Sequence, residues 1–189
     1  MKERPIIFNT SMVRAILDGR KTQTRRAIKS QPLSFFGQWY PTPWTERSKY
    51  YGTEKHFRKG MPIDFCPYGI PGDWLWVREA WASFKGDIYY RAEGSNNARI
   101  EETVGWKPSI FMPRWASRID LEITDIRVER VQDIIFGNIC NEGLSYTEDS
   151  KGLFNDWIAL WNSINAKRGY GWDVNPWVWV ISFRRIEEC

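Results

Sequence analysis

The run WVWVISF, residues 177–183, constrains the fold more than any other part of the sequence. Its β-branched and aromatic side chains have high strand propensity, and almost no polar residue marks a solvent-facing side. A strand of this kind is covered on both faces or wound into a barrel. We therefore predict that residues 175–186 form a strand that is either covered on both faces or wound into a barrel.

Hydrophobic periodicity predicts further strands and a few helices. We expect strands within residues 5–8, 21–28, 72–81, 87–93 and 116–131, the last with a register shift near Thr124 and Asp125. We expect helices from a cap at Asn9 or Thr10 to Gly19, from Asp133 to Glu142 with Gly143 as its stop, and from Gly152 to about Ala166. One apolar stripe on the last helix is assigned to the core: Leu153, Trp157, Leu160, Trp161 and Ile164.

The segment between these elements, at about residues 30–71, shows neither period and is rich in proline, glycine, charge and aromatic residues. We predict an irregular, aromatic-rich insertion there. A chain of 189 residues is long enough for one compact domain. The expected fold class is α+β, with a single domain over residues 1–189.

Composition argues against several kinds of site and indicates a cellular compartment. Cys66, Cys140 and Cys189 are far apart, which argues against a disulfide framework and against a paired-cysteine zinc site. The single histidine, His56, lies among charged residues and is given no catalytic role. The first residues lack the apolar core of a signal peptide, and no apolar run is long enough to span a bilayer. We expect a soluble, cytoplasmic protein with no metal or cofactor.

The net charge of +4 favours anionic partners only mildly, but the sequence holds 12 tryptophans. Aromatic rings interleaved with arginine can stack on nucleobases, and they can equally serve packing. Three basic clusters also allow two interpretations: they can form a phosphate-binding track, or they can be solvated loops and strand ends. These clusters are Arg114 with Arg118, Lys167 with Arg168, and Arg184 with Arg185.

The stretch GRKTQTRR, residues 19–26, places basic side chains just after the first predicted helix. Positive charge there can simply meet the negative end of the helix dipole, which contributes about 0.3–1 kcal/mol. It can also form a site. Along the strand that follows, Thr24 and Arg26 are expected on one face and Gln23 and Arg25 on the other.

Gly19, Lys21, Thr24 and Arg26 resemble the G-x-K-x-x-x-x-R signature of the ASCH superfamily, whose small curved β-barrel is related to the PUA RNA-binding domain. The blocks MVRAILDGRKTQTRR, PGDWLWVREAW and MPRWASRI are similar to longer members from bacteria and phages. The resemblance implies a PUA-like barrel flanked by helices. Some small members hydrolyse the acetamide of N4-acetylcytidine, so it also implies a metal-independent amidohydrolase.

Carried across residue by residue, the resemblance implies that Lys21, Thr24 and Glu142 are catalytic. Lys21 would activate water or attack directly, Thr24 would donate to the oxyanion, and Glu142 would protonate the leaving nitrogen. Glu79 is the alternative acid. Arg26, Arg20 and Arg25 are assigned to substrate binding, and Trp76 or Trp81 to stacking on a pyrimidine.

Two classes of function remain open from the sequence. In the first, the protein deacylates a modified pyrimidine nucleoside in a closed pocket. In the second, it is a non-catalytic RNA-binding module whose cleft holds a base or phosphate. A ribonuclease activity and a phage-assembly role are further alternatives, and no distinctive residue pair supports either.

Overall fold

The computed structural model describes residues 1–29, 31, 66–94, 98–145 and 149–186 in full. It also describes the backbone of residues 33–35, 38–40, 57–58, 61–62 and 97. His56 and Cys189 therefore lie outside the described residues, as does most of the predicted insertion. Among the helices that are described, none is long and apolar enough to cross a bilayer.

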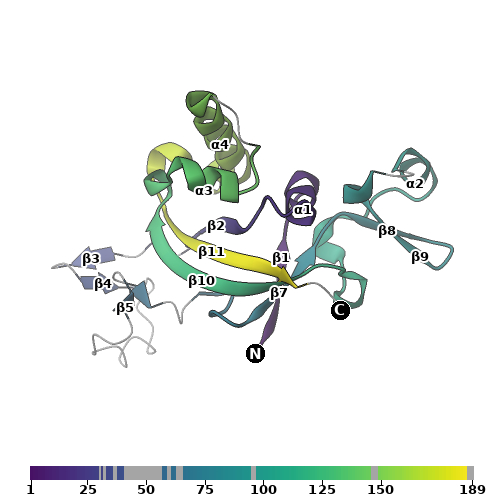
Figure 1. Ribbon diagram of the computed structural model, residues 1–189, viewed down its shortest axis with the longest axis horizontal. Helices are drawn as coiled ribbons and strands as arrows, with labels where there is room; N and C mark the ends of the chain where they lie inside the picture. Colours follow the sequence, from purple (N-terminus) through teal and green to yellow (C-terminus); the bar gives the residue numbers. More distant parts are fainter. Residues whose placement is uncertain are drawn as a thin grey trace.

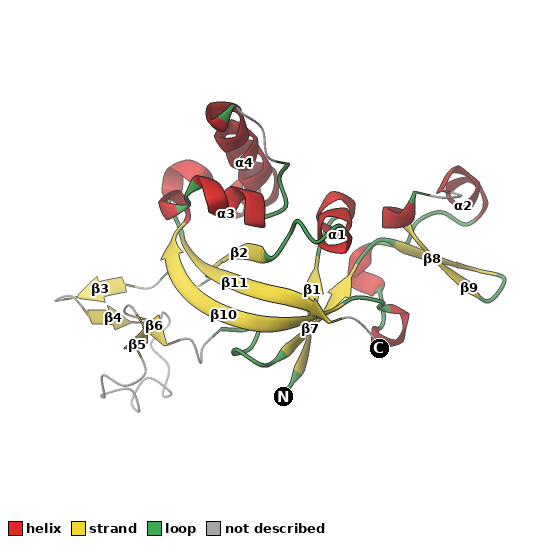
Figure 2. Cartoon of the chain, in the orientation of Figure 1, coloured by secondary structure: helices red, strands yellow, loops and turns green. Residues whose placement is uncertain are grey.

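A five-stranded curved sheet forms the centre of the α+β fold (Figures 1 and 2). Its strands are β1 (Glu3–Ile7), β2 (Gln23–Ala27), β7 (Trp74–Arg78), β10 (Asp120–Arg130) and β11 (Trp177–Ile186). They lie in the order β1-β7-β10-β11-β2. Only the β1–β7 pair of this sheet is parallel. No ladder joins the edge strands β1 and β2 in the described part of the chain, so no closed barrel is formed there.

Strand β11 is covered on both faces, as its composition predicts. Four consecutive residues, Val178–Ile181, are buried. Trp179, Ile181 and Phe183 join the larger core cluster on one face. Val178 and Val180 join a second cluster on the other face. The sheet therefore carries a hydrophobic core on each side at β11.

The first helix, α1 (Thr10–Leu17), begins as predicted at a cap: the Asn9 side chain accepts a hydrogen bond from the Met12 N–H at 2.8 Å. Its buried residues Val13 and Ile16 pack into the larger cluster. Gly19 follows with φ of +73°, a conformation that glycine adopts without strain.

Helix α3 (Phe136–Asn141) is shorter than the predicted Asp133–Glu142. Asp133 instead closes a 3₁₀ turn, Val131–Asp133, in which its carboxylate accepts a hydrogen bond from the Arg130 N–H at 3.1 Å. The predicted stop is confirmed, since Gly143 follows the helix with φ of +95°.

Helix α4 (Ser150–Asn165) begins two residues earlier than predicted, because the Asp149 side chain caps it. Leu153, Trp157 and Trp161 of its apolar stripe are buried, as predicted. Assigning the whole stripe to the core is wrong: Leu160 is half-buried and Ile164 is exposed, and both line a pocket.

The predicted strand at residues 72–81 is two strands. Strand β7 ends at Arg78, and β8 (Trp81–Phe84) starts a hairpin with β9 (Asp87–Tyr90). Figure 1 shows this hairpin and α2 (Asn97–Thr103) extending away from the main sheet. The register shift predicted in β10 is confirmed between Ile123 and Asp125, although β10 starts at Asp120 rather than at Ala116.

Within the predicted insertion, the described segments form two small ladders, which the sequence did not predict. They pair β3 (Leu33–Phe35) with β4 (Gln38–Tyr40), and β5 (Phe57–Arg58) with β6 (Met61–Pro62). Strands of two or three residues are too short to show a period of two.

Candidate functional site

The segment Arg20–Thr22 runs between the ends of two helices. The backbone N–H of Lys21 donates to the Ala15 carbonyl at the end of α1, at 2.9 Å. The N–H of Thr22 donates to the Asn141 carbonyl at the end of α3, also at 2.9 Å. Lys21 and Glu142 form an isolated antiparallel bridge between the two turns. Two helix ends far apart in sequence therefore place these residues together.

Gly143 is required for this close approach. A Cβ atom at this position would lie 2.8 Å from the Ala15 Cβ and 3.0 Å from the Lys21 Cβ. Its positive φ is also one that other residues adopt only with strain. The glycine predicted to stop α3 thus also lets Lys21 pass beside it.

The side chain of Lys21 is fully withdrawn from solvent and has all its protons hydrogen-bonded. Its Nζ donates to the Gln23 carbonyl at 2.8 Å, to the Glu142 carbonyl at 2.7 Å and to Glu142 Oε2 at 2.9 Å. Burial lowers the pKa of Lys21 below its ordinary value, and the carboxylate of Glu142 opposes this shift. The nearby cations Arg26 and Arg25 add to the lowering.

Arg25 is the second cation on Glu142. Its guanidinium donates to Glu142 Oε1 at 3.1 Å and to the Gln23 side-chain oxygen at 3.0 Å. It also pairs with Glu129 on β10, its Nε donating to Oε1 at 3.0 Å. Each carboxylate oxygen of Glu142 therefore accepts from one buried cation.

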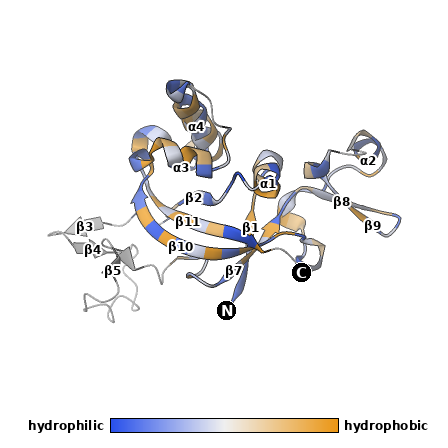
Figure 3. Cartoon of the chain, in the orientation of Figure 1, coloured by the Kyte–Doolittle hydropathy of each residue, from blue (hydrophilic) through white to orange (hydrophobic). Residues whose placement is uncertain are grey.

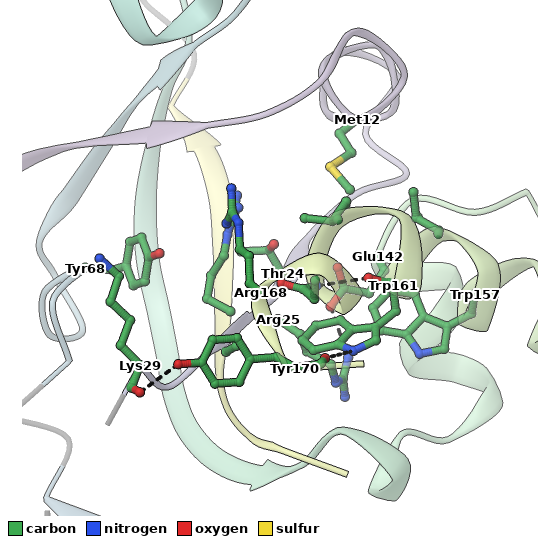
Figure 4. Close-up of a pocket in the computed structure, with 15 residues that line it drawn as sticks. Met12, Thr24, Arg25, Lys29, Tyr68, Glu142, Trp157, Trp161, Arg168 and Tyr170 are labelled. Atoms are coloured by element: carbon green, nitrogen blue, oxygen red, sulfur yellow. Dashed lines mark hydrogen bonds and ion pairs between the residues drawn. The ribbon is translucent and has the colours of Figure 1, made fainter. Parts of the chain in front are cut away.

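This network forms one wall of a pocket between β2 and α4 with a cavity volume of about 140 Å³. That is roughly ten times the space that one water molecule needs, so the pocket can hold a small ring system. Its polar wall includes Thr24, Arg25 and Glu142, and aromatic rings line it as well (Figure 4). These rings belong to Tyr68, Trp157, Trp161 and Tyr170.

Position along α4 explains the aromatic wall. Trp157 and Trp161 are four residues apart, and so share one helix face beside β2. The Trp161 indole N–H donates to the Tyr170 carbonyl at 2.8 Å, which fixes the ring relative to the loop after α4. Strand β2, coloured mostly as hydrophilic in Figure 3, contributes the polar residues Thr24, Arg25 and Arg26 to the pocket lining.

The structure brings together most of the residues selected from the sequence. Thr24 and Glu142, together with Arg25 and Arg26, line the pocket. Lys21 stands behind Glu142 and is not part of the lining. Arg20 is on the outside: its guanidinium donates to the Gly143 carbonyl and to Asp18, both at 2.8 Å.

Arg26 contacts the end of β1. Its Nη2 donates to the Ile7 carbonyl at 2.7 Å, and its guanidinium lies 5.1 Å from the centre of the Phe8 ring. This hydrogen bond spans the two edge strands of the sheet. The Nε of Arg26 is buried without a hydrogen-bond partner.

Trp76 and Glu79 lie elsewhere and do not line this pocket. The Trp76 ring is covered by Arg78 at 4.8 Å and by Arg114 at 6.0 Å. Glu79 is buried and accepts from Arg118 Nε at 2.9 Å, so it is not paired with Lys21. Burial raises the pKa of Glu79, and its pairing with Arg118 opposes that shift. Trp81 packs with Met112 and Ala116 in a separate small cluster.

Sequence reasoning missed several residues of the site. Gln23 and Glu129 orient Arg25, and Tyr68 and Tyr170 line the pocket from loops. Only a weak sequence signal pointed to Tyr170. It lies in the stretch AKRGYG, which directly follows α4 and so stays close to that helix.

In the part of the chain that the structure describes, no group of three or more His, Cys, Asp or Glu side chains could hold a metal ion. Comparison of the chain with models of protein families, with curated proteins and with solved structures found no match.

Proposed function

We propose that the protein is an amidohydrolase that removes the acyl group from an N4-acylated cytosine nucleoside. One observation carries this proposal. Thr24 and the buried carboxylate of Glu142 line a single aromatic pocket, and Lys21 holds that carboxylate from behind at 2.9 Å. The resemblance of GRKTQTRR to the ASCH signature selects Lys21 and Thr24 independently of the geometry, and the family's acid, carried across to the stretch NEGL, selects Glu142.

The geometry favours Glu142 as the group that moves the proton. Each of its oxygens keeps a lone-pair site beyond the hydrogen bond it already accepts. In the proposed reaction a water molecule attacks the acyl carbonyl carbon while Glu142 takes the proton of that water. The C–N bond then breaks and Glu142 returns the proton to N4, giving cytidine and a carboxylic acid, which releases its remaining proton to water and leaves as the carboxylate.

Thr24 and Lys21 have supporting roles in this scheme. The Thr24 hydroxyl donates a hydrogen bond to the oxyanion of the tetrahedral intermediate. Lys21 does not line the pocket, so it positions Glu142 and supplies positive charge behind it rather than attacking the substrate. The rings of Trp157, Trp161 and Tyr170 provide surfaces for the pyrimidine.

We also propose that the curved sheet is the open form of a PUA-like barrel. The hydrogen bond from Arg26 to the Ile7 carbonyl supports this, because it links the two sheet edges where a barrel would close. The free thiols of Cys66 and Cys140 fit a reducing cytoplasm.

The test is hydrolysis of N4-acetylcytidine by the purified protein, followed by chromatography of the nucleosides. We expect release of cytidine, insensitive to EDTA, and a loss of about 10²–10⁴-fold in Glu142→Gln. Glu129→Gln is the matched control, because Glu129 also pairs with Arg25 but does not line the pocket. Turnover in Glu142→Gln equal to that in Glu129→Gln would contradict the proposed role.

A non-catalytic RNA-binding module is the second candidate, and the exposed cations Lys29 and Arg168, which line the pocket together with its aromatic rings, favour it. The saturated ammonium of Lys21 fits both candidates, since neither uses it on a reacting group. In the second candidate the pocket binds an extruded base and nothing is cleaved. Binding of single-stranded RNA by a parent protein that releases no cytidine would support this candidate.

A further inference from the structure

The pocket has an excess of positive charge at its open end. Arg26, Lys29 and Arg168 all line it, and Lys29 and Arg168 are exposed. None of them has a carboxylate partner among the described residues. Glu142 is the acidic residue in the described lining, and it is already paired with Lys21 and Arg25. Among the described residues these charges are therefore unbalanced.

In the other two basic clusters seen in the sequence, three of the four arginines have acidic partners. Arg114 pairs with Glu3 at 2.9 Å and with Asp120 at 3.0 Å. Arg118 pairs with Glu79 at 2.9 Å, and Arg184 pairs with Glu122 at 2.6 Å. The cluster of Arg114 and Arg118 is thus fully paired with acids, whereas in the cluster of Arg184 and Arg185 only Arg184 is paired among the described residues. The third, at Arg168, is the one that faces the pocket.

Arg26 also contributes a hydrogen-bond donor that has no acceptor among the described residues. Its Nη2 is used by the Ile7 carbonyl, whereas its Nε is buried without a partner. Burial lowers the pKa of Arg26, Tyr68 and Glu142 oppose this shift, and the positive charge of Arg168 adds to the lowering. Cations that converge on one pocket, where the carboxylate of the described lining is already paired with two other cations, are stabilised when an anion binds.

The exposed cations of the pocket lie apart from its buried tryptophans. Figure 4 shows Lys29 and Tyr68 on one side of the pocket and Trp157 on the opposite side. Trp157, Trp161, Thr24 and Glu142 are buried, while Lys29 and Arg168 are at the solvent. A ligand with a flat apolar ring at one end and an anionic group at the other matches this division.

We infer that the ligand of this pocket is a nucleotide, with its base between the aromatic side chains and its phosphate held by Arg26, Lys29 and Arg168. The inference rests on the proposed function for the identity of the base and goes beyond it, because a free nucleoside has no phosphate. A phosphate monoester offers strong acceptors to the fork of an arginine and to a lysine ammonium.

The experiment compares kcat/KM for N4-acetylcytidine with the values for its 5′- and 3′-monophosphates. We expect one monophosphate to be preferred by about tenfold or more, as charge-assisted hydrogen bonds at a partly exposed site provide. Arg168→Gln is expected to remove most of this preference. Lys167→Gln is the matched control, because this neighbouring exposed lysine does not line the pocket.

The outcomes separate the inference from the proposed function. Turnover of the nucleoside and both monophosphates with equal kcat/KM overturns the inference and leaves the amidohydrolase intact. No turnover of any of them overturns the amidohydrolase. Calorimetric titration with cytidine and with its monophosphates then decides the inference: tighter binding of a monophosphate that Arg168→Gln abolishes supports it, and equal binding overturns it.

Discussion

The ammonium of Lys21 and the carboxylate of Glu142 lie 2.9 Å apart, with 0% and 2% of their side chains exposed. The two residues are separated by 121 positions in sequence. A buried pair of this kind is costly to break, because removing one partner leaves the other charged and unpaired in the interior. The pair therefore links the stability of the fold to the geometry of the candidate site.

The first prediction concerns this pair. Lys21→Met is expected to lower the free energy of unfolding by about 3–5 kcal/mol, because it leaves Glu142 with Arg25 alone. Adding Glu142→Gln in the same chain is expected to cost less than the sum of the two single substitutions. Urea unfolding of the parent, both single variants and the double variant measures this coupling. Strictly additive costs would show that the two side chains do not interact.

The second prediction concerns Thr24. Thr24→Val keeps the branched shape but removes the hydroxyl, so turnover of the acylated nucleoside should fall about 10²–10³-fold. Thr24→Ser keeps the hydroxyl and should retain most of the turnover. Steady-state kinetics with both variants tests this role. A valine variant as active as the serine variant would exclude the hydroxyl from the reaction.

The third prediction concerns the glycine beside Lys21. Gly143→Ala is expected to cost more than about 2 kcal/mol, because its positive φ is strained and the new methyl group would meet Ala15 and Lys21. Gly137→Ala within α3 is the matched control: its Cβ meets nothing within 4 Å. That control should gain about 0.5–1 kcal/mol from helix propensity. Thermal unfolding should show a lower midpoint temperature than in the parent protein for Gly143→Ala and a higher one for Gly137→Ala.

The fourth prediction concerns Cys66. Burial raises the pKa of its thiol to about 11 from an ordinary 9.0. The folded state therefore holds this proton more tightly, so the stability that it contributes is present below pH 9 and is lost as the pH rises towards 11. Cys66→Ala should show a shallower fall in the free energy of unfolding between pH 9 and 11. Urea unfolding at several pH values compares the two slopes, and identical slopes would contradict the shifted pKa.

The sequence predicted elements whose signal is local. The cap at Asn9 and the bulge between Ile123 and Asp125 were both visible, because each interrupts a periodic pattern at its own position. The start of α3 was wrong because Asp133 can cap either an α-helix or a 3₁₀ turn, and packing of the flanking chain decides which.

The site was only partly predictable, because it depends on which faces of the strands and helices pack against one another in the folded chain. The strand pattern around Trp76 predicts a large ring but not what it packs against. In the structure the guanidiniums of Arg78 and Arg114 lie over that ring. The pairing of Lys21 with Glu142 followed from the family resemblance, and no spacing within the chain indicated it. The loop residues Tyr68 and Tyr170 had no periodic pattern to mark them.

The position of β2 in the sheet has a consequence during synthesis of the chain. The sheet neighbour of β2 is β11, and Gln23 bonds to Ser182 across 159 residues. A ribosome therefore releases Lys21 and Thr24 long before the strand that will hold them. Until β11 emerges, the polar strand β2 has no neighbour in this sheet, and the pocket between β2 and α4 stays incomplete. Residues 19–26 can thus complete their part of the pocket only after β11 has been synthesised.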